Sequence, residues 1–260
     1  MKATRKLIPA IALLLVSAVL LSTASYAWFT TNKVVDATMS VGVTAPQNLQ
    51  ISKDGSAWSS SVKFNEFGSG AVLTPVSSKD GKSFVVCRDL VLDQDGVFDT
   101  AALNALLGDP SKGTVEEVTG PSDAEGTYYV INNFQLRASQ AFTAGKLTLD
   151  VVIDADSSEA YKGAVRVLVY FDKEKDDTYS QLVYASEGTH NAIEKNADSF
   201  KVSDTAYAKS NTVTSLEFDA ATAYKFQVVV WVEGNDPACI SANVDDATEL
   251  DISLTFTLAE

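Results

Sequence analysis

Apolar and polar residues alternate along several stretches of this chain, most regularly after Tyr128. In each stretch, one set of alternate residues is apolar, and in the last stretch the other set, Asp251, Ser253, Thr255 and Thr257, is polar. The clearest apolar sets are Leu147, Leu149, Val151 and Ile153; Val165, Val167, Val169 and Phe171; Phe226, Val228, Val230 and Val232; and Ile252, Leu254, Phe256 and Leu258. A two-residue repeat predicts β-strands that place one face on a core and leave the other in water.

Shorter elements are predicted between and before these strands. Asp99 or Thr100 can cap a brief helix that ends at Gly108, inside a long connection over residues 88–126. The polar residues 174–215 are predicted to be surface loop with one short strand. Further strands are predicted within residues 48–52, 58–70, 84–87 and 128–136.

Many short strands, Gly and Asp turns and almost no helical periodicity predict an all-β fold. We expect an antiparallel β-sandwich of jelly-roll type, with one short helix in the connection over residues 88–126. Residues 46–260 are expected to form this single domain.

The start of the chain has the order of a secretory signal: a basic start, an apolar run and small residues before a cleavage site. These parts are Lys2, Arg5 and Lys6, then residues 7–21, then residues 22–27. We expect residues 1–27 to be a signal peptide with an apolar helix, cut between Ala27 and Trp28. The apolar run contains Pro9 and is shorter than the roughly 20 residues of a membrane-spanning helix. The alternative is a retained helix, as a membrane anchor or a pilin stem.

The charge balance is strongly acidic, with 20 basic and 34 acidic residues and a net charge of −14. Removal of the signal takes away three cations and leaves a net charge of about −17. Such a surface repels nucleic-acid phosphates and anionic membranes and keeps an exported protein soluble. We therefore expect a secreted or cell-surface protein with no nucleic-acid partner, which contacts the membrane only through an uncleaved signal.

Cys87 and Cys239 are the only cysteines. In an exported chain they can form one disulfide, which would close a loop of about 150 residues and contribute at most about 5 kcal/mol. The alternative is two separate buried thiols. Neither cysteine has the Cys-x-x-Cys spacing of a thioredoxin-type redox site.

Candidate catalytic and metal motifs are few. His190 is the only histidine, which excludes a His-Glu-x-x-His zinc site, and no Gly-x-Ser-x-Gly elbow is present. Residues 93–96 and 154–156 resemble fragments of calcium loops, but position twelve counted from Asp93 is Asn104, where such a loop needs Glu. We expect no metal, no cofactor and no enzymatic activity.

The most distinctive loop, residues 233–239, follows the strand that ends at Val232. Glu233, Asn235 and Asp236 in this loop can accept main-chain amide hydrogens at a tight turn, which is the usual role of such residues before proline. The alternatives are catalytic carboxylates or metal ligands.

Residues 22–30 resemble the signal and mature start of the TasA/camelysin group of exported Gram-positive proteins, which depend on a dedicated signal peptidase. In that group a small residue, Tyr or Phe, and Ala end the signal, and an aromatic pair with a small polar residue follows; Tyr26-Ala27-Trp28-Phe29-Thr30 fits this pattern. Residues 230–239 also resemble a recurring C-terminal segment of uncharacterised exported proteins with this type of signal. The resemblance covers the two ends of the chain and not its middle.

Membership of this group implies a jelly-roll domain that polymerises into extracellular fibres of a biofilm matrix. Each subunit would complete the sheet of the next with its N-terminal strand, here residues 28–45, and Pro46 would provide a hinge. The partners would be further copies of the chain, together with matrix or surface proteins. The side chains that would fill the groove of the next subunit are Val35, Ala37, Met39, Val41 and Val43.

Other functions remain open at this point. The strand at residues 28–45 can also pair within its own domain. The chain can be a monomeric surface adhesin or binding module, a pilin-like subunit that keeps its helix, or an enzyme of an unfamiliar type that uses Glu233 and Asp236.

Overall fold

The computed structural model describes residues 36–43, 49–64, 73–88, 114–118, 128–138, 145–155, 161–172, 180–186, 189–196, 199–209, 214–218, 223–236, 238–239 and 249–259. The predicted signal peptide, its cleavage site at Ala27 and Trp28, and the predicted helix near residues 100–107 lie outside these ranges. Among the described residues, no helix is long and apolar enough to cross a membrane.

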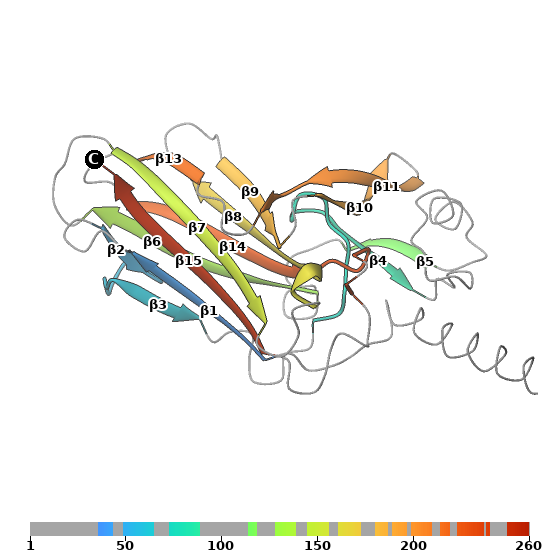
Figure 1. Ribbon diagram of the computed structural model, residues 1–260, viewed down its shortest axis with the longest axis horizontal. Coiled ribbons are helices and arrows are strands. Elements are labelled where there is room, and N and C mark those ends of the chain that lie inside the picture. The colour runs from blue at the N-terminus through green and yellow to red at the C-terminus, as the bar shows by residue number, and fades with distance from the viewer. Residues whose placement is uncertain are drawn as a thin grey trace, which may run out of the picture.

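Two sheets face each other in a β-sandwich (Figure 1). The first sheet has the strand order β13-β7-β15-β1-β3. Its strands are β1 (Asp36–Val43), β3 (Ser61–Phe64), β7 (Gly145–Ala155), β13 (Thr214–Phe218) and β15 (Glu249–Ala259). The second sheet has the order β12-β9-β8-β14-β6-β2. Its strands are β2 (Leu49–Ser52), β6 (Tyr129–Ala138), β8 (Val165–Asp172), β9 (Ser180–Ala185), β12 (Ala208–Lys209) and β14 (Ala223–Val232).

The predicted alternation is confirmed in the four strands that carry it most clearly. The apolar residues of β7, β8, β14 and β15 point into one core between the two sheets, and those whose side chains are described are at most 4% exposed. Phe134, Phe171, Phe226 and Phe256 form the aromatic centre of this core, with ring centroids 4.7–5.8 Å apart. The all-β sandwich therefore follows from the two-residue repeat, because each strand must bury its apolar face against the other sheet.

Consecutive strands often lie in opposite sheets. The chain passes from the first sheet to the second and back through β1, β2 and β3, and crosses again at β6–β7, β7–β8, β13–β14 and β14–β15. Most neighbouring strands are antiparallel, but β1 and β15 are parallel, as are β9 and β12. Strands β1 and β15, the first and the last that the structure describes, thus lie side by side.

Two smaller ribbons extend from one end of the sandwich (Figure 1). One pairs β4 (Phe84–Arg88) with β5 (Thr114–Val118), and the other pairs β10 (Thr189–Asn196) with β11 (Ser199–Ala206). The prediction of surface loop over residues 174–215 was wrong, because β9 to β12 lie within it and β13 begins there. The ribbon buries its apolar residues Ala192, Ile193 and Val202, and Phe200 packs partly buried against the main core.

The outer face of the second sheet is not fully wet, contrary to the simple prediction. Residues 76–86 fold over one end of it and enclose a second, smaller core. The buried side chains of this core are Val76, Phe84, Val86, Tyr129, Leu168, Val229 and Trp231. Part of β8 and β14 is therefore buried on both faces, which explains why their outward residues Leu168, Val229 and Trp231 are also apolar.

Candidate functional site

Strand β1 lies inside the first sheet, between β15 and β3 (Figure 1). All eight of its residues are in parallel register with β15, from Asp36 opposite Glu249 to Val43 opposite Phe256. On its other side, residues 39–42 pair antiparallel with β3. A strand from another copy of the chain could occupy the same slot only if β1 left it.

The predicted donor residues fall partly within this strand. Met39 and Val41 are fully buried in the main core, and Val43 is half-buried against it. Ala37 is in β1, although its side chain is not among those described, and Val35 lies outside the described residues. Of the side chains that the sequence assigned to a groove, Met39 and Val41 are therefore buried in the core of their own chain.

Polar contacts also hold β1. On the outer face of the sheet, the hydroxyl oxygens of Ser40 and Ser253 on β15 lie 3.1 Å apart. On the core side, the amide of buried Asn132 on β6 lies 3.9 Å from the sulfur of Met39. Asn132 Oδ1 has no hydrogen-bond partner among the described residues. An unpaired buried carbonyl oxygen costs roughly 1–3 kcal/mol, so the contact between β1 and the second sheet is imperfect.

The distinctive loop after β14 is buried. Glu233 is 0% exposed, Asn235 4% and Asp236 3%. The Glu233 carboxylate accepts hydrogen bonds from the main-chain amide of Ser78, at 3.0 Å, and from Trp231 Nε1, at 3.3 Å. It also accepts the amide of Asn235, and Asp236 accepts the amide of Ala238 at 2.8 Å. The predicted acceptance of main-chain amides is thus confirmed for Glu233 and Asp236.

Asp236 has a second partner that sequence reasoning missed. Its Oδ2 accepts a hydrogen bond from Nη2 of Arg166, 2.5 Å away, and the Arg166 side chain is 0% exposed. Arg166 also donates to the main-chain oxygens of Gly163 and Val165. The sequence did indicate such a partner, because Arg166 stands within the apolar run of residues 165–169. A strand buried on both faces can hold an arginine only when a carboxylate pairs with it.

The electrostatics of the loop follow from its burial. Burial raises the pKa of Glu233 above its ordinary value, while the nearby Arg166 cation and the hydrogen bonds to the carboxylate act in the opposite direction. Together, Glu233, Asp236 and Arg166 link the end of β14, the start of β8 and the segment at residues 76–78. The arrangement is a structural junction at one end of the sandwich.

Cys239 ends this loop as a buried free thiol, and burial raises the pKa of that thiol further above its ordinary value. The suggested disulfide between Cys87 and Cys239 is therefore not formed in this structure. Cys87 is in β4, but its side chain is outside the described set. A thiol that is rarely ionised is a poor nucleophile, so Cys239 acts here as a small apolar residue.

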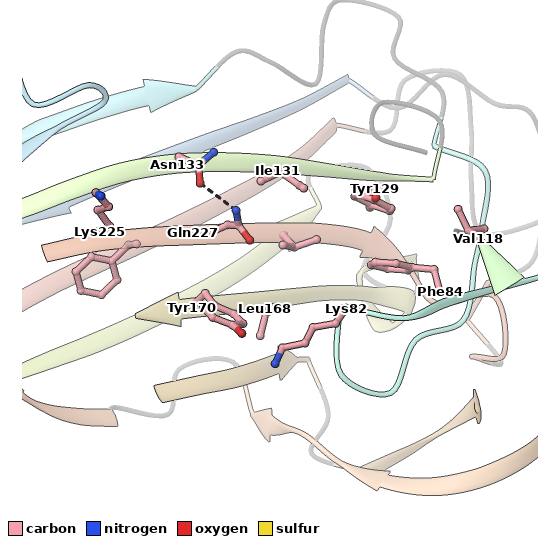
Figure 2. A pocket seen from close by; sticks show the side chains of 13 residues that line it. Lys82, Phe84, Val118, Tyr129, Ile131, Asn133, Leu168, Tyr170, Lys225 and Gln227 are labelled. Carbon is pink, nitrogen blue, oxygen red and sulfur yellow. Dashed lines mark hydrogen bonds between the residues drawn. The ribbon is translucent and has the colours of Figure 1, made fainter. Parts of the chain in front are cut away.

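A groove of about 560 Å³ lies on the outer face of the second sheet (Figure 2). Its floor is formed by β6, β14 and β8, and one wall is the turn at residues 81–84. Asn133 and Gln227 share a hydrogen bond of 3.0 Å on this floor. Lys82 and Lys225 also line the groove, and Lys82 Nζ lies 5.0 Å from the centre of the Tyr170 ring. Sequence reasoning did not predict this groove, because it depends on how residues 76–86 fold back over the sheet.

No group of three or more His, Cys, Asp or Glu side chains that could hold a metal ion occurs among the described residues. Of the calcium-loop fragments, only Asp154 and Ala155 are described, and the Asp154 side chain is exposed. His190 is in β10, not in a loop as expected, and its side chain is not described.

Comparisons with known proteins returned no match. No family model, no curated protein and no solved structure is similar to this chain at a significant level.

Proposed function

We propose that this chain is an exported structural subunit of an extracellular fibre, of the kind that the TasA/camelysin resemblance implies. In this proposal, cleavage between Ala27 and Trp28 leaves β1 close to the mature N-terminus. Strand β1 then leaves its own first sheet and enters the equivalent slot of the next subunit, between that subunit's β15 and β3.

The observation that supports this proposal is the position of β1. It supplies fully buried side chains, Met39 and Val41, to a core otherwise built by later strands. It is also the first described strand, paired in parallel with the last one, so no hairpin ties it to β15. An element held by side-chain burial and main-chain pairing can be exchanged between identical subunits with the same contacts, which makes the exchange inexpensive.

The jelly-roll connectivity expected for that family belongs to the same proposal. Its support is the crossing of consecutive strands between the two sheets, as in β1 to β3 and β13 to β15. Greek-key and jelly-roll folds bring distant strands together in this way.

A cross-linking experiment tests the exchange directly. Ser40 and Ser253 are register partners on neighbouring strands, and their side chains touch, so S40C/S253C should form a disulfide with little distortion. The secreted protein would carry this pair together with Cys87→Ala and Cys239→Ala. If fibres form by exchange, their oxidation gives a ladder of covalent oligomers on a non-reducing gel. Oxidation of the monomer first gives an internal cross-link, and that locked protein should form no fibres under the electron microscope.

The matched control is T148C/T257C, which joins β7 to β15 in the same sheet without touching β1. After oxidation it should still form fibres, and each subunit should migrate as a monomer on the gel. Fibres that contain only internal Ser40–Ser253 cross-links would refute exchange by β1. A protein that stays monomeric at all concentrations would support the monomeric surface binding module instead.

A further inference from the structure

The groove on the outer face of the second sheet has features of a binding site that are independent of β1. Its volume, about 560 Å³, falls within the roughly 300–1,000 Å³ range of small-ligand sites in proteins. It faces away from the main core, whereas β1 belongs to the other sheet. Binding here can therefore be tested whether or not the subunits exchange strands.

The charged side chains that line the groove are basic, although the chain as a whole is acidic. The chain has 34 acidic and 20 basic residues, yet the described residues that line the groove include Lys82 and Lys225 and no Asp or Glu. Lys225 comes from the start of β14 and Lys82 from the turn that walls the groove, so the two cations border the same hollow (Figure 2). Electrostatic complementarity favours an anionic ligand.

The rest of the lining offers amides beside apolar surface. The hydrogen bond between Asn133 and Gln227 leaves further donor and acceptor positions on both amides, and the Asn133 side chain is exposed. Ile131 and Tyr170 are half-buried and provide apolar contact area beside this pair. Sugar rings present the same combination, because hydroxyl groups both donate and accept hydrogen bonds while ring C–H faces are apolar.

An extended peptide fits this floor less well. Strands β14 and β8 are interior strands that pair with neighbours on both sides, whereas β6 pairs with β14 along the groove and with β2 only over residues 135–138. A peptide that lies over the face of β14 and β8 therefore cannot be added as a further strand, which is the mode that gives extended peptides much of their affinity on sheets. Recognition in the groove has to come from side chains.

We propose that this groove binds an acidic oligosaccharide, a chain of sugars that carry carboxylates. Lys82 and Lys225 contact carboxylates, Asn133 and Gln227 bind hydroxyl groups, and Ile131 and Tyr170 contact the ring faces. In an extracellular fibre such a site would attach acidic polysaccharide along the outside of the subunits.

The test is titration calorimetry of the secreted protein with an oligomer of α-1,4-linked galacturonate. The fully methyl-esterified oligomer is the matched ligand, because it has the same backbone without the charge. We expect the acidic oligomer to bind and the ester to bind at least tenfold more weakly. Lys82→Gln and Lys225→Gln should each weaken binding roughly three- to tenfold, as expected for the loss of one partly exposed charged contact. Both lysines are exposed, so the folded state should survive.

Lys63→Gln is the control variant, since it removes a lysine that is also exposed, from β3 in the other sheet. It should leave affinity unchanged, whereas Asn133→Ala/Gln227→Ala should lower it while thermal unfolding stays as in the wild type. The proposal is overturned if the ester binds as tightly as the acid, or if Lys63→Gln weakens binding as much as Lys225→Gln. It is also overturned if poly-glutamate binds as tightly as the galacturonate oligomer, because the groove would then select charge or peptide and not sugar.

Discussion

At the scale of single residues, two glutamates show that position alone decides whether the pKa of a carboxyl group is raised or lowered. Glu233 is fully buried beside Trp231, Ser78 and the Arg166–Asp236 pair, and burial raises its pKa. Glu194 lies on the β10–β11 ribbon, where its oxygens are 2.9 Å from Lys79 and 3.2 Å from Lys201, and Lys79 above all lowers its pKa.

These opposite shifts predict opposite pH dependences. A carboxyl with a raised pKa binds a proton more tightly in the folded state, so its stabilising effect is largest at low pH and declines as pH rises above about 4.5. As pH increases, the free energy of unfolding of the wild type should therefore fall relative to that of Glu233→Gln. Urea unfolding at a series of pH values measures this difference.

Glu194→Gln is the control with the same change of side chain. Its carboxyl has a lowered pKa, so the stabilising effect is present above the unfolded pKa and is lost as pH falls. The advantage of the wild type over Glu194→Gln should grow with pH, although it should stay small because the pair is at the surface. If both variants showed the same sign of pH dependence, the assigned burial of Glu233 would be wrong.

At the scale of elements, the turn at residues 78–83 determines whether the second core is closed. The Ser78 hydroxyl accepts the amide of Gly81 and donates to the carbonyl of Ser83, and Asp80 accepts the amides of Lys82 and Ser83. Gly81 has φ of +69°, a left-handed conformation that glycine adopts without strain. The turn brings Gly81 directly against Leu168 and Trp231.

Gly81→Ala should lower the free energy of unfolding by about 2–4 kcal/mol, from left-handed strain together with overpacking. A Cβ at this position would lie 2.8 Å from Leu168 Cδ2 and 3.1 Å from Trp231, both in the buried second core. Urea unfolding followed by Trp fluorescence measures the loss.

The matched variant is Gly55→Ala, since Gly55 also has a positive φ, +81°, but its new Cβ would meet only the end of the Gln135 side chain. That side chain can move, so we expect a loss of only about 1–2 kcal/mol from strain alone. Equal losses in the two variants would mean that the turn at Gly81 does not pack on the second core as described.

At the scale of the whole molecule, the acidic charge opposes assembly. Copies of the chain, each with a net charge of −14, repel one another at low ionic strength, and salt screens this repulsion. If the chain forms fibres, their growth should be faster in about 0.1 M than in about 0.01 M NaCl, as followed by light scattering.

The oxidised S40C/S253C variant distinguishes fibre growth from precipitation. It should form no fibres, so its light scattering should not increase with time at either salt concentration. Fibre growth that slowed with salt would indicate that attraction between opposite charges, and not strand burial, drives assembly.

The proposed binding of acidic oligosaccharide should show the opposite salt dependence and weaken as ionic strength rises.

The sequence by itself determined the fold class and the position of most long strands. Period-two alternation in β7, β8, β14 and β15 is a local property, since each strand needs one apolar face whatever its partner is. The role of the loop at residues 233–239 was also predictable in part, because Glu233 and Asp236 accept amides of residues close to them in the chain.

Only the tertiary structure decided which distant segments meet. The pairing of Arg166 with Asp236, the parallel pairing of β1 with β15, and the second core under residues 76–86 each join segments far apart in sequence. Their signals in the sequence are single residues, such as a charge within an apolar run, and a single residue does not identify its partner. The polar ribbon of β10 and β11 was missed for the same reason, because burial of Ile193 and Val202 depends on the body on which the ribbon packs.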